Sequence, residues 1–113
     1  MSLFVSIYVL LHGHPMPPLP RVLERVACEK YVEGVNDCSN KAGRYAKACN
    51  AAGIPATVVY VRCFGSRHLN AIVQVAGLFV DCTTGDVKRT LAEFGEKVTA
   101  VTLLQLARDE ELA

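Results

Sequence analysis

A change of hydrophobic period at Gly53-Ile54-Pro55 constrains the fold of this 113-residue chain more than any other feature. Before this point, apolar and small residues recur at helical spacing, and after it they lie in short valine-rich runs. A glycine here can end a helix in the left-handed conformation, and a proline two residues later prevents the helix from continuing. The switch therefore predicts helices first and strands afterwards, which is the order of an α+β domain.

Two helices are predicted before the switch. The first covers residues 21–32 and is closed by Gly34, and the second covers residues 38–52, with Asn36 or Asp37 as its N-cap. Residues 12–20 contain four prolines and are predicted to form a loop. Residues 1–11 are almost wholly apolar but too few to cross a bilayer, which takes about 20 residues, and they lack the marks of a signal peptide. We expect them to form a buried strand or a short helix.

An antiparallel sheet is predicted after the switch. Its strands are expected at residues 56–63, 69–75 and 78–81, with Ala76-Gly77 as the hairpin turn and residues 64–67 as a loop. Residues 87–94 are expected to form a short helix that Gly95 ends, and residues 97–106 a strand or a helix. The prediction is one α+β domain over residues 1–113, with N-terminal helices packed on a small antiparallel sheet.

The charge pattern and the cysteines limit the class of protein. The formal net charge is +1, and no basic run is interleaved with aromatic residues, which argues against a nucleic-acid partner. The five cysteines are an odd number without a CxxC pair or zinc-finger spacing, so no metal or other cofactor is expected. A domain of this size needs no disulfides, which favours a reducing, cytoplasmic setting. No membrane partner is expected, and the oligomeric state is left open.

Three residues stand where thiol chemistry would need them. Cys38 follows the predicted helix cap, and a helix N-terminus lowers the pKa of a thiol. His68 begins one predicted strand, and Asp81 ends the next. Because a hairpin brings the start of one strand beside the end of the other, His68 and Asp81 are expected to lie near each other. The trio predicts a nucleophile, a general base and a carboxylate that orients the base.

The remaining cysteines fit other roles. Cys28 and Cys49 fall inside the predicted helices, on or near their apolar faces, and we expect both to be small buried hydrophobic residues. Cys63 stands at a strand end, and Cys82 follows Asp81 directly.

Residues 36–85 resemble the transglutaminase-like cysteine enzymes, which share the papain-like core. The matching blocks are Asp37-Cys38-Ser39, Gly53-Ile54-Pro55-Ala56, His68-Leu69-Asn70-Ala71 and Asp81-Cys82-Thr83-Thr84. In that family a proline usually follows the aspartate, where this chain has Cys82, and an aromatic residue often stands at the place of Asn70. The resemblance implies a papain-like α+β core with a Cys38–His68–Asp81 triad and a peptide or protein substrate.

The chemistry that follows is acyl transfer, most simply amide or peptide hydrolysis. The oxyanion would be held by the backbone N–H of Cys38 and by Tyr31 or Asn36, between which the sequence does not choose. Asp37-Cys38-Ser39 also resembles the start of the NlpC/P60 cell-wall peptidases, which usually continue with glycine.

Two other classes stay open. The first is a catalytically inactive relative that binds a peptide or protein. The second is a metal site made of Cys38, His68 and Cys82 with His12 or His14, whose spacings match no standard ligand pattern.

Overall fold

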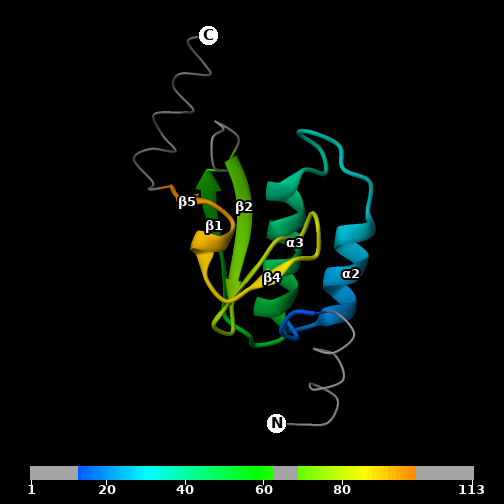
Figure 1. The fold of residues 1–113 in the computed structure, drawn as a ribbon. Coiled ribbons are helices and arrows are strands. Elements are labelled where there is room, and N and C mark those ends of the chain that lie inside the picture. Colours follow the sequence, from blue (N-terminus) through cyan, green and yellow to red (C-terminus); the bar gives the residue numbers. More distant parts are fainter. Residues whose placement is uncertain (1–12, 63–68, 99–113) are drawn as a thin grey trace.

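The computed structural model describes residues 13–62 and 69–98. These residues form two helices and a curled antiparallel sheet, which confirms the α+β class (Figure 1). α3 packs against β1 and β2, and α2 packs against α3. The elements are α2 (Pro20–Cys28), α3 (Cys38–Ala51), β1 (Ala56–Arg62), β2 (Leu69–Val75), β3 (Leu78–Val80), β4 (Val87–Lys88), the 3₁₀ turn η1 (Leu91–Glu93) and β5 (Glu96–Lys97).

Both ends of α3 are fixed by local hydrogen bonds. At its start, the Asp37 carboxylate accepts the backbone N–H groups of Ser39 and Asn40, and the Asn40 side chain accepts the N–H of Asp37. Asp37 is therefore the N-cap, and this reciprocal pair is a capping box. At its end, Gly53 has φ +78° and donates to Asn50 O, while Ile54 donates to Cys49 O. This Schellman motif is the physical reason that the period changes where it does.

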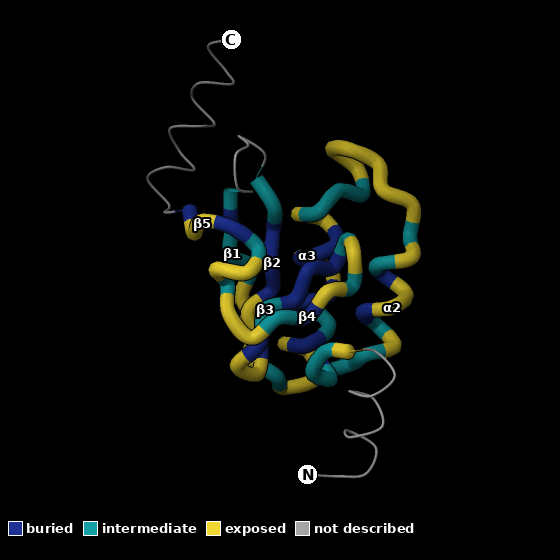
Figure 2. The backbone as a smooth tube through the Cα atoms, in the orientation of Figure 1, coloured by how far each residue is buried: buried dark blue, intermediate teal, exposed yellow. Residues whose placement is uncertain are grey.

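The sheet has the strand order β4-β3-β2-β1-β5. β1 and β2 pair over their full lengths, from Ala56 opposite Val75 to Arg62 opposite Leu69. The predicted hairpin is confirmed, since Ala76 and Gly77 both have positive φ, as a two-residue type I′ turn requires. The sheet and the helices enclose one hydrophobic core, which runs as a dark band along α3 and β2 in Figure 2.

Three sequence predictions differ from the structure. The first helix ends at Cys28 instead of residue 32, because Glu29 is already extended. Residues 87–94 are not one helix: Val87 and Lys88 pair with β3, where Val87 is buried, and only Leu91–Glu93 forms a 3₁₀ turn. β5 starts before residue 97 and pairs with β1 through Glu96 and Lys97. The rest of the predicted element at 97–106, beyond residue 98, lies outside the described residues, as do residues 1–12.

Candidate active site around Cys38

Cys38 is the first residue of α3 and lies where the sequence predicts it. Its side chain is half-buried and packs against the hydrophobic core. The cap beside it has a second effect, since hydrogen bonds from the backbone N–H groups of Asn40 and then Gly34 lower the pKa of Asp37. Asp37 is therefore ionised at neutral pH, and its negative charge partly offsets the positive end of the helix dipole at Cys38.

Tyr31 is the predicted oxyanion residue whose pKa depends on Cys38. The pKa of its phenol is raised by desolvation first and then by the charge of a Cys38 thiolate, while the backbone N–H of Cys38 lowers it. The phenol therefore keeps its proton at neutral pH and can donate a hydrogen bond. The other oxyanion candidate, Asn36, has hydrogen bonds at both ends of its side-chain amide. Its Nδ2 donates to Lys30 O at 2.7 Å, and its Oδ1 accepts from Arg44 at 2.7 Å. Of the two candidates, Asn36 is thus held by Lys30 and Arg44, whereas the pKa of Tyr31 is coupled to Cys38.

Asp81 is buried, and both oxygens of its carboxylate are hydrogen-bonded. Oδ1 accepts the backbone N–H groups of Thr83, at 2.9 Å, and Thr84, at 3.4 Å, and so holds the turn after β3. Oδ2 accepts Nδ2 of Asn70 at 2.9 Å. The side chain that the described structure brings to Asp81 is thus Asn70. His68, the predicted partner, lies outside the described residues and immediately precedes β2.

The pleat of β2 decides which face of the sheet these polar groups occupy. Ala71 and its cross-strand partner Tyr60 face α3, since both belong to its core and the Tyr60 hydroxyl lies 3.3 Å from Ser39 Oγ. Side chains alternate along a strand, so Asn70 faces away from α3. Its bond to Asp81 places that carboxylate on the same far face, whereas Cys38 packs on the near one. The described residues therefore join Asp81 to Asn70 and do not join it to Cys38.

The other described cysteines differ from Cys38 in burial and position. Cys82 is 1% exposed, and desolvation, followed by the neighbouring charge of Asp81, raises its pKa to about 12. Cys49 is fully buried as predicted, and its pKa is also raised, chiefly by desolvation. Cys28 is exposed, which corrects the expectation that it is buried. It is the last residue of α2, at the negative end of a helix dipole.

Two groups of this region have roles that the sequence does not predict. Asn70 stands in the sequence only as a departure from the family pattern. Lys41 is 1% exposed, and its ammonium donates to Ala27 O at 3.2 Å and Glu29 O at 2.6 Å, at the end of α2. It thereby anchors the chain where the loop toward Cys38 begins. A lysine after Ser39 and Asn40 in the first turn of a helix gives no sign of burial, since its partners come from another element.

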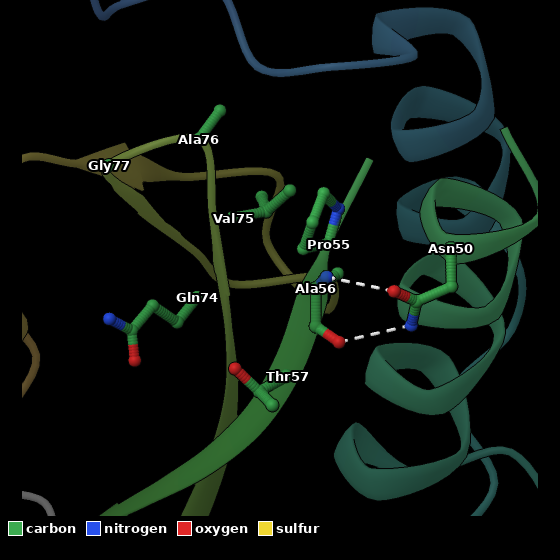
Figure 3. Close-up of a pocket in the computed structure, with 8 residues that line it drawn as sticks. All are labelled: Asn50, Pro55, Ala56, Thr57, Gln74, Val75, Ala76 and Gly77. Atoms are coloured by element: carbon green, nitrogen blue, oxygen red, sulfur yellow. Dashed lines mark hydrogen bonds between the residues drawn. The ribbon is translucent and has the colours of Figure 1, made fainter. Parts of the chain in front are cut away.

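Two pockets formed by described residues lie away from Cys38. One, of about 340 Å³, is at the other end of α3, where the Asn50 side chain bridges the backbone N–H and carbonyl of Ala56 (Figure 3). Its lining contains no thiol, imidazole or carboxylate. The other, of about 280 Å³, is lined by Gly13 and His14 together with Lys88 and Arg89. The loop that contains His14 thus lines a pocket.

The metal hypothesis gains no support from the described residues. Among residues 13–62 and 69–98, no three histidine, cysteine or acidic side chains are grouped so that they could hold an ion. His12 and His68 lie outside these ranges. Within the same ranges, no helix is long and apolar enough to cross a membrane.

Comparisons with protein-family models, with curated proteins and with solved structures find no match to this chain.

Proposed function

We propose that this protein is a thiol-dependent acyl-transfer enzyme, most simply an amide or peptide hydrolase, with Cys38 as its nucleophile. The observation that carries the proposal is the setting of Cys38. It begins a capped 14-residue helix and is not fully buried, and the pKa of the Tyr31 phenol, raised by desolvation and then by the charge of its thiolate, leaves that phenol protonated at neutral pH. Among the described cysteines, Cys49 and Cys82 lack access, and Cys28 stands at the wrong end of a helix.

The proposed reaction proceeds through a thioester. Cys38 first gives its thiol proton to the general base, and its Sγ attacks the amide carbonyl carbon. The Tyr31 hydroxyl and the Cys38 N–H stabilise the negative oxygen that forms. The C–N bond then breaks and the leaving amine takes a proton from the general base, for which His68 is the candidate. Water next attacks the thioester, its proton passes through the same base to the sulfur, and the acid product leaves.

Asp81 has a narrower part in this proposal than a triad would give it. Its Oδ1 is occupied by the turn after β3, and its Oδ2 already accepts from Asn70. It can orient His68 only as a second hydrogen bond to Oδ2, or through Asn70. The proposal therefore depends on Cys38 and His68 and treats Asp81 as an anchor of the start of β2.

Alkylation across a pH series tests the proposal, because this chain contains its own reference thiol. Iodoacetamide is added between pH 5 and 9, and the modified cysteines are quantified by mass spectrometry. We expect Cys38 to react faster than Cys28 below pH 7, since the proposed pairing with His68 would activate the Cys38 thiol. The variant His68→Ala should remove this advantage, and Asp81→Asn should reduce it less. Equal rates at Cys38 and Cys28 in the unmodified protein would refute the proposal.

A second candidate is a catalytically inactive domain that binds a peptide or protein. The observation in its favour is that Asp81 is bonded to Asn70 on the sheet face away from Cys38. A carboxylate used in this way stabilises the fold and needs no imidazole. This candidate predicts a Cys38 that reacts no faster than Cys28 and is indifferent to His68→Ala.

A further inference from the structure

The exposed large apolar side chains of the described residues gather in one short segment. Tyr31, Val32 and Val35 are 43%, 40% and 74% exposed, and no other large apolar side chain in residues 13–62 and 69–98 is exposed. They lie in the loop between α2 and α3, which is the yellow arch above α2 in Figure 2. Every one of them is within seven residues of Cys38. We name these three side chains the 31–35 surface.

The loop that presents the 31–35 surface is held in place by hydrogen bonds. Asn36 N donates to Val32 O at 2.6 Å, and Val32 N donates to Asn36 O at 3.1 Å. Gly34, at φ +77°, donates its N–H to Asp37 Oδ2 at 3.0 Å. Arg44 of α3 joins the Asn36 side chain to Glu29 at the base of the loop. The backbone is thus satisfied without burying any of the three apolar side chains, so a fixed apolar patch faces the solvent.

The size and position of this patch indicate its occupant. Three partly exposed side chains present on the order of a few hundred Å², well below the roughly 800 Å² per partner of a stable protein interface. The patch therefore suits a single side chain better than a second copy of the chain. It lies beside the start of α3, because Val32 pairs with Asn36 and Gly34 bonds to Asp37, the residue before Cys38. Exposed Lys30 and Glu33 give it a polar rim.

We propose that the 31–35 surface binds a large apolar side chain of an extended peptide, at the residue whose carbonyl carbon Cys38 attacks. The substrate class is then a peptide with an aliphatic residue, such as leucine, on the acyl side of the cleaved bond. The catalytic meaning of this inference rests on the proposed function, whereas the apolar preference of the surface does not. Covering about half of a leucine side chain corresponds to a preference of about tenfold over glycine.

Two chloromethyl ketones measure this preference on the full-length protein. Acetyl-leucyl and acetyl-glycyl chloromethyl ketone carry their electrophilic carbon next to the residue in question, and the rate of each at Cys38 is followed by mass spectrometry. We expect the leucyl reagent to react about tenfold faster in the unmodified protein. In Val35→Ser, and in the double variant with Val32→Ser, the ratio should fall toward one. Glu33→Ser, in the same loop, is the matched control and should retain the ratio.

The rate with iodoacetamide separates the two proposals. That reagent has no side chain to bind, so its rate reports the reactivity of Cys38 alone, and each chloromethyl ketone rate is divided by it. Two results overturn the inference: a leucyl-to-glycyl ratio below about two in the unmodified protein, or a ratio that neither serine variant alters. Either result leaves open the proposal that Cys38 is an activated thiol. Conversely, a leucine preference at a Cys38 that reacts no faster than Cys28 keeps the binding surface and refutes the enzyme.

Discussion

Replacing Asn70 by alanine tests whether the Asn70–Asp81 hydrogen bond stabilises the fold. Asp81 is 6% exposed, and the bond measures 2.9 Å. A hydrogen bond to a charged group contributes about 1.5–3 kcal/mol to stability. Asn70 is only half-buried, so we expect Asn70→Ala to lower the free energy of unfolding by about 2 kcal/mol. In urea, with a slope near 2 kcal/mol per molar, the unfolding midpoint would fall by about 1 M.

A double-mutant cycle isolates the bond from the other contacts of the two residues. Asn70→Ala, Asp81→Ala and the double variant are unfolded in urea and followed by circular dichroism. Asp81→Ala should cost more than Asn70→Ala, because it also releases the N–H groups of Thr83 and Thr84. The double variant should cost less than the sum of the two, by about 1–2 kcal/mol of coupling.

The matched control for the cycle is Asn50→Ala. Asn50 bonds the backbone of Ala56 at the other end of α3 and touches no group of the Asn70–Asp81 pair. Its effect should add to that of Asp81→Ala within about 0.5 kcal/mol. If the Asn70–Asp81 coupling is equally small, the bond contributes nothing measurable, and Asp81 is available for another partner.

Three other predictions address the cap, a buried thiol and the hairpin. Asp37→Ala should cost about 1 kcal/mol at pH 7, and Asp37→Asn much less, because asparagine also caps helices. Hydrogen bonding, first from Asn40, lowers the pKa of Asp37 below its ordinary 3.8. The stabilisation by the Asp37 carboxylate is therefore present above pH 4 and is lost as the pH falls through the lowered pKa. Urea unfolding at pH 7 and pH 3 should show a smaller cost of Asp37→Ala at pH 3, and an equal cost at both would contradict this. Cys82, with its pKa raised to about 12, should stay unmodified by iodoacetamide at pH 8 and react once urea unfolds the chain; native labelling would show that its burial is incomplete. Ala76 has φ +52°, so Ala76→Gly should stabilise the hairpin by about 0.5–1 kcal/mol, as seen in the melting temperature, and a loss of stability would mean that the turn carries no strain.

Local signals of the sequence predicted the parts of the fold that local hydrogen bonds determine. Asp37 caps α3 and Gly53 ends it, through bonds that span no more than five residues. Ala76-Gly77 makes the hairpin for the same reason. The first helix was predicted too long because its apolar spacing continues through Tyr31, while the chain already turns at Glu29. That residue is held there by Lys41, whose place in the sequence is twelve residues away.

The candidate site likewise has features that the local sequence predicts and features that it does not. Cys38 at a helix start follows from the neighbouring cap, so it could be predicted, and so could Tyr31 or Asn36 as neighbours of the thiol. That Asn36 is bonded elsewhere could not be predicted, because its partner Arg44 belongs to α3. The exposure of Cys28 likewise depends on where α2 ends.

The sequence by itself determined the order of the elements, the two ends of α3, the hairpin and the position of Cys38 at a helix start. All of these depend on backbone conformations and hydrogen bonds between residues a few positions apart. Only the tertiary structure decided that Asp81 bonds to Asn70 and that β4 pairs with β3. These outcomes depend on strand register and on the face to which each side chain points, which a shift of one residue would reverse. The order of residues along the chain indicates the chemistry, and the pleat of the sheet decides which side chains meet.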